Sequence, residues 1–297
     1  MADFVELCEV GPRDGFQFEA TPIPTAFKLR VIRGLMAAGV RRIQATSFVH
    51  PKWVPQMADA EVVLEALLPE ASQYGTTLTA LALNVKGVER AVAAGVGTVD
   101  LSIALNEQHA KDNANMSVQQ GIDAAHAMLD AAAQAGVAAQ LGLQTVWGYQ
   151  EPDDTLLARV REVVAAFADR DLESLSLADS TGMASPVTIK RTVEAVRAAA
   201  PGVDLVLHLH DTRGLGMANV AAAIEAGVRR FDTSLGGLGG CPFIPGATGN
   251  IATEDTAYLV GRLGLRHGLD VPGVAAISRA VEDHVGHALS GRMYRLV

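Results

Sequence analysis

The stretch Ala38-Gly39-Val40 is the first of four copies of one tripeptide, and the others lie at Ala94-Gly95-Val96, Ala135-Gly136-Val137 and Ala226-Gly227-Val228. Each copy follows a helix-like stretch and precedes a strand-like one. A glycine just past a helix takes the left-handed conformation that ends it, and the β-branched valine favours a strand. The copies are separated by two, one and three units of about 28 to 41 residues, which is the length of a strand–helix repeat.

Working outward from these copies, the sequence predicts eight strands, with helical patterns between them. The expected strands span Val5–Val10, Arg42–Thr46, Leu78–Asn84, Thr98–Ala104, Ala138–Thr145, Glu173–Ala178, Asp204–His208 and Arg230–Ser234. This alternation favours an α/β fold, a (β/α)8 TIM barrel. An open doubly wound sheet is less consistent, because no G-x-G-x-x-G follows the first strand. We expect residues 1–297 to form a single TIM-barrel catalytic domain with an extra C-terminal helix between Leu269 and Val297.

The composition is that of a compact globular protein, because 49% of the 297 residues are hydrophobic and only 19% are charged. The net charge of −9 argues against a nucleic-acid partner, since binding phosphates needs a basic face. No run approaches the roughly 18 apolar residues of a membrane span, so we expect no membrane partner. The lack of a basic, apolar leader and the widely separated Cys8 and Cys241 favour a cytoplasmic location.

Two histidines stand at the end of the seventh expected strand, in His208-Leu209-His210-Asp211. Side chains at i and i+2 of a strand point to the same face, so both imidazoles converge on one point. They could form a hydrogen-bonded structural pair, or they could hold a divalent metal ion. A second cluster, Glu9 to Gly15, also follows a strand and adds a carboxylate and a guanidinium, which favours the metal site.

In a TIM barrel the catalytic groups come from the C-terminal ends of the strands. The side chains expected at this mouth are Arg13, Asp14, Gln44, Thr46, Ser47, Asn84, Asn106, Glu107, His109, Trp147, Asp179, His208 and His210. After the eighth strand come the glycine-rich run Gly236 to Pro242 and then Gly246, Gly249 and Asn250.

Two imidazoles, a carboxylate and an amide oxygen suit a hard or borderline divalent ion such as Mg²⁺ or Mn²⁺. Such an ion polarises a substrate oxygen, while Arg13 can stabilise an enolate oxygen. The glycine-rich run is irregular, and we expect it to move. Its Cys241 is either incidental or a thiol that a lid delivers as acid or base. A phosphate loop is less consistent, because the P-loop lysine and Ser/Thr are absent.

Several motifs follow one another along nearly the whole chain. They are Glu9 to Gly15 with Gln17, Thr46 to Val49 with Pro51 to Met57, Asn106 to His109, Asp179 to Gly182, His208 to Gly214, and Gly236 to Pro242 with Gly246, Ala247, Gly249 and Asn250. With these motifs the chain resembles the 3-hydroxy-3-methylglutaryl-CoA lyase family of metal-dependent lyase and aldolase barrels. The loop around Cys241 and the run Trp53 to Met57 are specific to the lyase branch of this family.

Carried over residue by residue, the resemblance implies metal ligands, catalytic groups and substrate contacts. The implied ligands of Mg²⁺ or Mn²⁺ are Asp14, His208, His210 and Asn250. The implied catalytic residues are Arg13 at the thioester enolate, Cys241 as the lid thiol that handles the enolate's proton, Asp179 and His208. The implied substrate-binding residues are Gln17, Gln44, Thr46, Trp147, Glu107 and His109.

Some of these residues have a structural alternative. Asp179 could cap a helix, because a Ser185-Pro186 helix start follows it. Glu107 and His109 could hold the fourth loop in place. Glu9 could anchor the barrel end through an interior ion pair.

The implied reaction is the retro-Claisen cleavage of a 3-hydroxy-3-methylglutaryl-CoA-type substrate. A base takes the proton of the 3-hydroxyl, the bond between carbons 2 and 3 breaks, and the resulting acyl-CoA enolate is protonated. The products are acetyl-CoA and a 3-keto acid, acetoacetate. The expected partner is therefore a small-molecule acyl-CoA, and the extra C-terminal helix could supply the face of a homodimer.

Three departures from the family leave the substrate open. Gln44 stands where the family usually has glutamate, Gln144 to Tyr149 replaces a cysteine- and glycine-rich stretch, and Phe18-Glu19-Ala20 replaces Asn-Glu-Lys. One alternative is therefore the same chemistry on a different 3-hydroxyacyl-CoA. The others are a related aldolase or synthase, which the lack of a long C-terminal regulatory domain disfavours, and a non-catalytic acyl-CoA-binding barrel, which would not need the thiol of Cys241.

Overall fold

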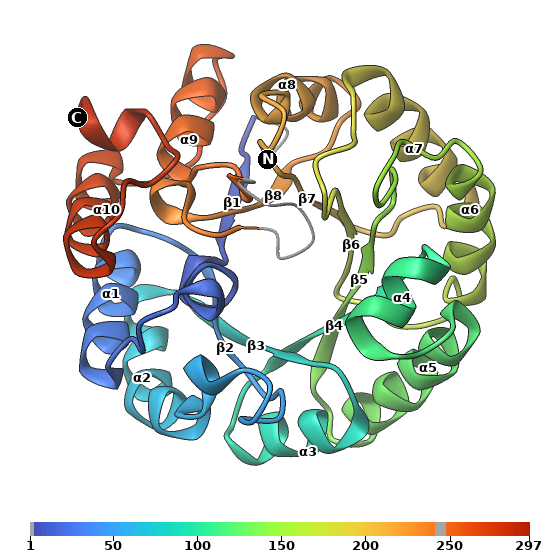
Figure 1. Ribbon diagram of the computed structural model, residues 1–297, viewed down its shortest axis with the longest axis horizontal. Helices are drawn as coiled ribbons and strands as arrows, with labels where there is room; N and C mark the ends of the chain where they lie inside the picture. The colour runs from blue at the N-terminus through green and yellow to red at the C-terminus, as the bar shows by residue number, and fades with distance from the viewer. Residues whose placement is uncertain (1–2, 241–247) are drawn as a thin grey trace.

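A computed structural model describes residues 3–240 and 248–297 of the chain. Within these residues eight parallel strands close into a barrel in sequence order, and helices surround it (Figure 1). The strands are β1 (Glu6–Glu9), β2 (Arg42–Ser47), β3 (Thr77–Ala82), β4 (Thr98–Ala104), β5 (Ala138–Gln144), β6 (Ser174–Ala178), β7 (Leu205–His208) and β8 (Arg230–Thr233). The predicted TIM barrel is confirmed, and every predicted strand is present with small differences at its ends.

The helices between and after the strands form the outer ring of the barrel (Figure 1). They are α1 (Thr25–Ala37), α2 (Ala60–Tyr74), α3 (Val85–Ala93), α4 (Glu107–Ala114), α5 (Val118–Gln134), α6 (Leu156–Ala166), α7 (Pro186–Ala199), α8 (Gly216–Glu225), α9 (Thr253–Arg262) and α10 (Val271–Val285). The last of these is the predicted extra helix, and it packs against α1 and α9. In the described residues no helix is long and apolar enough to cross a membrane.

The Ala-Gly-Val copies work as the sequence analysis predicts. Gly39 follows α1 with a φ of 86°, and Gly227 follows α8 with the same φ. Such positive φ values are accessible to glycine at little cost, so each copy ends one helix and lets the next strand begin.

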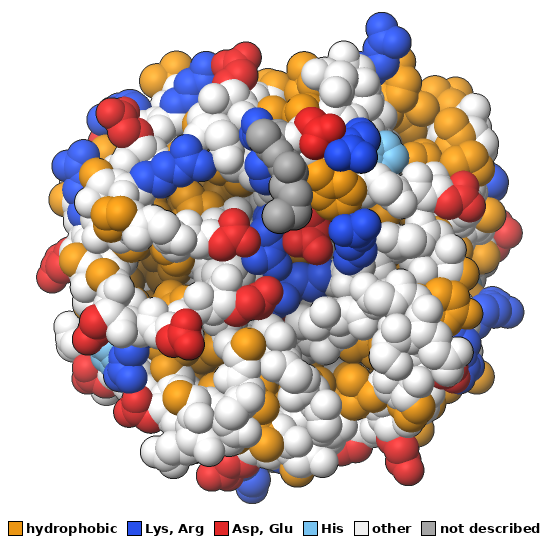
Figure 2. All heavy atoms as spheres, turned by 180° about the vertical axis from the view of Figure 1, so that it is seen from behind, with side chains coloured by type: hydrophobic (Ala, Val, Ile, Leu, Met, Phe, Trp, Pro, Cys, Tyr) orange, Lys and Arg blue, Asp and Glu red, His pale blue; other side chains and the backbone are white. Residues whose placement is uncertain are grey.

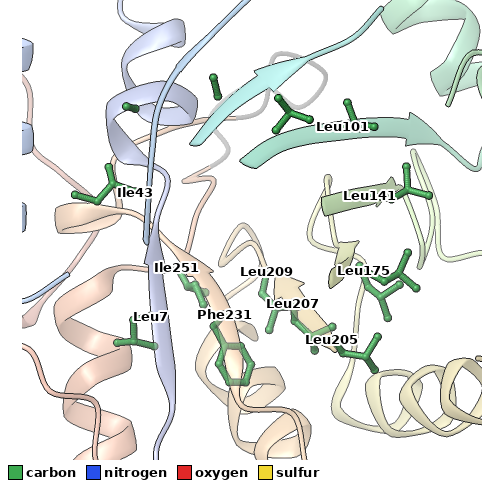
Figure 3. Close-up of a cluster of buried hydrophobic side chains, with 14 of the residues drawn as sticks. Leu7, Ile43, Leu101, Leu141, Leu175, Leu205, Leu207, Leu209, Phe231 and Ile251 are labelled. Atoms are coloured by element: carbon green, nitrogen blue, oxygen red, sulfur yellow. The ribbon is translucent and has the colours of Figure 1, made fainter. Parts of the chain in front are cut away.

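The main apolar layer lies between the barrel strands and the surrounding helices. Figure 3 shows part of it, and its side chains are almost fully buried. The members on the strands include Leu7, Ile43, Leu101, Leu141, Leu175, Leu207 and Phe231. Since successive strand residues point to opposite faces, their neighbours along each strand point into the barrel.

The interior of the barrel is largely polar. Arg42 of β2 donates to Asp100 of β4 at 2.8 Å, and because these strands are not neighbours the contact must cross the interior. At the start of β8, Arg230 pairs with Glu6 at 2.8 Å and Asp204 at 2.7 Å. Side chains of both charge signs also gather near the middle of the face opposite that of Figure 1 (Figure 2). Barrels of this kind are usually filled by branched apolar residues, so the polar interior is a distinct feature of this chain.

Candidate active site

The turn after β1 places a guanidinium and a carboxylate side by side. Residues Gly11–Gly15 form one turn of π-helix, in which the Asp14 amide donates to the Val10 carbonyl at 2.7 Å. Arg13 Nη1 lies 2.6 Å from Asp14 Oδ1, and Gln17 Nε2 donates to the same oxygen at 2.9 Å. The predicted cluster of Arg13, Asp14 and Gln17 is therefore formed.

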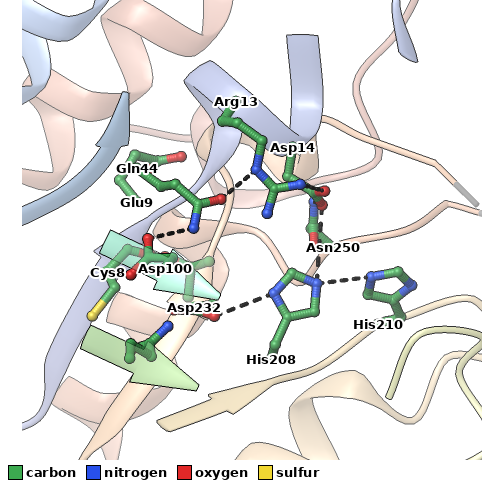
Figure 4. A network of polar contacts seen from close by, with 12 residues as sticks. Cys8, Glu9, Arg13, Asp14, Gln44, Asp100, His208, His210, Asp232 and Asn250 are labelled. Carbon is green, nitrogen blue, oxygen red and sulfur yellow. Dashed lines mark hydrogen bonds and ion pairs between the residues drawn. The ribbon is translucent and has the colours of Figure 1, made fainter. Parts of the chain in front are cut away.

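The two predicted histidines converge on this carboxylate (Figure 4). His208 is the last residue of β7, and its Nε2 lies 3.1 Å from Nε2 of His210 and 3.9 Å from Oδ2 of Asp14. One potential ligand atom from each of the three residues lies within 4.8 Å of the other two. Far-apart segments of the chain thus build one candidate metal centre.

Asp232 is a part of this centre that the sequence analysis missed. It lies on β8 in register with His208, and its Oδ2 is 3.3 Å from His208 Nδ1. A carboxylate on one ring nitrogen fixes the imidazole and turns its other nitrogen toward a metal. The sequence signal that could have identified Asp232 is an acidic residue inside a predicted strand, where the preceding predicted strand ends in a histidine.

The surroundings of the three residues shift their pKa values in different directions. Burial, together with the neighbouring His208, lowers the pKa of His210 to about 3, so its imidazole is neutral at pH 7. Burial opposes ionisation of Asp14, but Arg13, His208 and Asn250 outweigh it and lower its pKa. Burial likewise opposes charging of His208, but Asp232 and Asp14 raise its pKa.

The donor set itself fits a divalent ion. Among the described residues, Nδ1 of His210 is buried without a hydrogen-bond partner, while its Nε2 faces Nε2 of His208. Two imidazole nitrogens and one carboxylate oxygen facing a common point match the ligands of borderline divalent ions. Asp14, His208 and His210 therefore form a candidate metal site.

Asn250, the predicted fourth ligand, lies against this centre, and its ligand role stays a prediction. Its Nδ2 donates to Asp14 Oδ2 at 2.8 Å, and its side chain is buried. Gly239 sits beside it with a φ of 136°, where a Cβ atom would come within 2.7 Å of Asn250 Nδ2. The glycine at this position lets the start of the glycine-rich run lie directly on the candidate metal centre.

Gln44 and Thr46 extend the site along β2. Arg13 Nε donates to Gln44 Oε1, and Gln44 Nε2 donates to Asp100 Oδ2 at 2.5 Å (Figure 4). Thr46 is buried, and its hydroxyl contacts Met57 Sδ at 3.7 Å. Gln44 thus joins the mouth of the barrel to its polar interior.

The comparisons with known proteins agree with this geometry. The family model HMGL-like matches residues 4–281. The chain belongs to the HMGL-like family. A hydroxymethylglutaryl-CoA lyase of Bacillus subtilis is 34% identical, and the match covers 97% of this chain and 95% of that protein. A mitochondrial hydroxymethylglutaryl-CoA lyase of Arabidopsis thaliana is 35% identical over 95% of this chain, which spans only 60% of its length.

Two further matches concern ligands and substrates. A Pseudomonas aeruginosa protein named 3-hydroxy-3-isohexenylglutaryl-CoA/hydroxy-methylglutaryl-CoA lyase is 38% identical over 90% of this chain and 88% of its own length. The structure of an Acinetobacter baumannii HMG-CoA lyase in complex with coenzyme A and 3-methylmalate superposes with a TM-score of 0.90. It shares 34% identity, over 99% of this chain and 95% of that one.

In this HMGL-like chain, Asp179 follows the end of β6 and lies beside His208. Its amide donates to the His208 carbonyl at 2.8 Å, and its carboxylate accepts from the amides of Met183 at 2.7 Å and Ala184 at 3.1 Å. Burial raises the pKa of Asp179 to about 6, although these hydrogen bonds lower it. The predicted capping alternative needs correction, because the side chain of Ser185 caps α7 and Asp179 holds the preceding loop.

Glu9 needs a second correction. Its carboxyl contacts the amides of Gly11 at 2.8 Å and Leu235 at 2.9 Å and the hydroxyl of Thr253 at 2.7 Å. The part of the chain that the structure describes gives it no ion pair, so the expected interior ion pair is wrong. Without a cation, burial raises the pKa of Glu9 to about 8.

Glu107 and His109 contact residues outside the candidate metal centre. Glu107 contacts the Val118 amide at 3.1 Å and Arg159 at 3.2 Å, so it ties α4 to its neighbours. His109 is buried, its ring meets that of Tyr149 edge-on at 5.0 Å, and burial lowers its pKa to about 4.

Trp147 and Cys241 complete the set of predicted residues. The buried Trp147 donates from Nε1 to Thr192 Oγ1 of α7 at 3.0 Å, so its indole packs toward the helix layer. Cys241 and the expected movement of its loop fall within 241–247, outside the described residues.

Proposed function

We propose that this chain is a divalent-metal-dependent carbon–carbon lyase that cleaves a 3-hydroxy-3-methylglutaryl-CoA-type substrate into acetyl-CoA and acetoacetate. The observation that carries the proposal is the convergence of Asp14, His208 and His210 beside the Arg13 guanidinium. Membership of the HMGL-like family supports it. The Acinetobacter baumannii enzyme seen with coenzyme A and 3-methylmalate supports an acyl-CoA as the small-molecule partner.

In this proposal Asp14, His208 and His210 hold Mg²⁺ or Mn²⁺, with Asn250 as a further ligand. When bound, the ion supplies Lewis-acid polarisation of substrate oxygens. His210 suits a ligand role because its imidazole is neutral over the physiological pH range. Asp232 lies 3.3 Å from Nδ1 of His208, which leaves Nε2 of that ring for the ion and supports the ligand role.

Arg13 stabilises the oxyanion that develops on the thioester. The proton of the 3-hydroxyl leaves to a base, the electron pair of the O–H bond forms the new carbonyl, and the pair of the C2–C3 bond passes into the enolate. Asp179 is proposed to act at this hydroxyl beside His208, since a carboxyl of pKa about 6 exchanges protons near neutral pH. The thiol of Cys241 is proposed to return a proton to the enolate carbon.

The substrate contacts proposed from the sequence divide into two groups. Gln17 contacts Asp14 and Gln44 contacts Arg13, which supports their role, whereas the role of the buried Thr46 stays a prediction. Glu107, His109 and Trp147 have the structural contacts described above, and their substrate role stays a prediction.

A second candidate substrate has a larger group on carbon 3. The Pseudomonas aeruginosa relative, whose name includes 3-hydroxy-3-isohexenylglutaryl-CoA, favours it. The neutral Gln44 beside Arg13 also favours an altered pocket. Changes of this size shift enzyme specificity by about 1–3 kcal/mol.

The test uses the purified protein with Mn²⁺, first on 3-hydroxy-3-methylglutaryl-CoA and then on analogues with larger 3-substituents. We expect acetyl-CoA and the matching 3-keto acid in equal amounts. A specificity constant at least tenfold higher for a larger analogue selects the second candidate. No cleavage of any analogue would overturn the proposed function.

The single domain, the cytoplasmic location and the homodimer stay predictions.

A further inference from the structure

A column of three side chains, Arg42, Asp100 and Gln44, connects the polar interior of the barrel to Arg13 in the candidate active site. Arg42 donates to Asp100 Oδ1 at 2.8 Å, and Gln44 Nε2 donates to Asp100 Oδ2 at 2.5 Å. Gln44 Oε1 in turn accepts from Arg13 Nε (Figure 4). We propose that Asp100, acting through Gln44, is a positioning residue that orients the Arg13 guanidinium for the lyase reaction. The proposal deepens the function proposed above and rests on it.

The chemistry of the partners allows only one orientation of the Gln44 amide. A guanidinium has only donors to offer, and a carboxylate only accepts. The amide oxygen must therefore face Arg13, and the amide nitrogen must face Asp100. If the amide turned over, a donor would face Arg13 and an acceptor would face Asp100, so both hydrogen bonds would be lost.

Asp100 is itself held firmly. It is only 4% exposed, and Thr79 donates to its Oδ2 at 2.5 Å. Arg42, which pairs with its Oδ1, is held on its other side by Glu173 at 2.8 Å. A buried carboxylate with donors on both oxygens has little freedom to turn, so it fixes the nitrogen end of Gln44.

The guanidinium of Arg13 is held by two contacts, one with Gln44 at the end of the column and one with Asp14. Nε is bonded to Gln44, and Nη1 lies 2.6 Å from Asp14. The described residues accept no hydrogen bond from Nη2, which leaves this nitrogen available to a substrate oxygen. Two fixed contacts on a planar guanidinium set the direction of its remaining donors.

Because the side chain of Gln44 is neutral, the negative charge of the column lies at Asp100 and not beside Arg13. The carboxylate is at Asp100, against Arg42, and the group that touches Arg13 is neutral. Glutamate at position 44 would place two carboxylates in direct contact, because Asp100 would lose its amide donor. Exchanging both residues, Gln44→Glu with Asp100→Asn, moves the negative charge from position 100 to position 44. Every hydrogen-bond donor of the column still faces an acceptor.

The experiment is this exchange, made as two single variants and one double variant. In Asp100→Asn the new amide nitrogen faces Gln44, so Gln44 must turn and present its own nitrogen to Arg13. We expect kcat to fall at least tenfold while KM and the Mn²⁺ affinity change less than threefold. Gln44→Glu should lose a similar factor. The double variant should recover kcat to within about threefold of the wild type.

Thr76→Val is the matched control. It removes a buried hydroxyl donor, which bonds the Val40 carbonyl at 2.7 Å and contacts neither Asp100 nor Gln44, so we expect kcat within threefold of the wild type. Melting temperatures of all variants show whether folding is affected. If Asp100→Asn does not fold, Gln44→Glu against the double variant still tests the proposal.

A readout that does not depend on turnover separates this inference from the proposed function. The NMR signal of Arg13 Nε–H, assigned by its loss in Arg13→Lys, should shift in both single variants and differ less from the wild type in the double variant. An unchanged kcat in Asp100→Asn, or a double variant no better than the worse single variant, would overturn the inference. A wild type that cleaves no analogue would overturn the function, and the NMR signal would still test the positioning.

Discussion

Replacing Arg13 by glutamine removes the cation while leaving most of the candidate metal centre in place. Asp14 accepts hydrogen bonds from Arg13, Gln17 and Asn250, so the variant keeps two of these three donors. The carboxylate should therefore hold its position, and we expect the affinity for Mn²⁺ to change by less than about tenfold. The principal loss should be in catalysis.

The size of that loss follows from where charge develops. The thioester oxygen is weakly charged in the bound substrate and becomes an oxyanion as the C2–C3 bond breaks. Loss of one donor at such an oxygen typically lowers kcat by about 10²–10³, or about 2.7–4 kcal/mol. KM should change less than about threefold, because Arg13 acts mainly after binding.

The assay is the initial rate of acetyl-CoA release from 3-hydroxy-3-methylglutaryl-CoA at saturating Mn²⁺, with chromatographic detection. Arg13→Lys serves as the control, since it keeps the charge but loses the planar guanidinium, and we expect an intermediate kcat. An unchanged kcat with a raised KM in Arg13→Gln would mean that Arg13 only anchors the substrate, and the reasoning would then be refuted.

Three other changes test separate parts of the site. His210→Ala should weaken Mn²⁺ binding by at least tenfold in a titration followed by electron paramagnetic resonance, and wild-type affinity in this variant would remove His210 from the ligand set. Cys241→Ser should keep substrate and metal binding and lose most of kcat, because a hydroxyl is a weaker acid than a thiol of pKa about 8.5; full turnover would make the thiol incidental. Glu9→Gln tests a group whose pKa is raised to about 8 in the fold. Its contribution to stability is complete below the unfolded pKa and declines as pH rises toward 8, so wild type should lose up to about 1.4 kcal/mol per pH unit relative to the variant between pH 5 and 8. Parallel stability curves for the two proteins in urea would show that Glu9 does not titrate there.

The sequence predicted the barrel and the upper part of the site for the same physical reason. Helix-ending glycines such as Gly39 mark the strand–helix repeat, and parallel strands all end at the same rim of a barrel. Polar residues that follow different strands, such as Asp14 and His210, could therefore be placed together before any contact was known. Their distances confirm the convergence.

The residues below the rim could not be found in this way. Asp100 and Asp232 lie inside short strands, and their partners come from other strands of the closed barrel. Alternation along a strand shows which residues share a face, but the register and closure that bring Asp100 to Gln44 are properties of the whole barrel.

The position of the Trp147 side chain could not be predicted from the sequence for a different reason. The residue two positions before it, Thr145, has a positive φ of 58°, which is rare for a β-branched side chain. The chain turns there, and the indole of Trp147 packs onto Thr192 of α7. A local backbone outlier of this kind leaves no recognisable pattern in the sequence.

The central claim is that Asp14, His208 and His210 hold one divalent ion that carbon–carbon cleavage requires. The most direct measurement adds Mn²⁺ in steps to the metal-free protein and follows bound Mn²⁺ and formation of the 3-keto acid, from the analogue with the highest specificity constant, in the same samples. The account predicts that the rate rises in proportion to bound metal and saturates at one ion per chain. Cleavage by the metal-free protein, or one bound ion per chain with no cleavage, would contradict it.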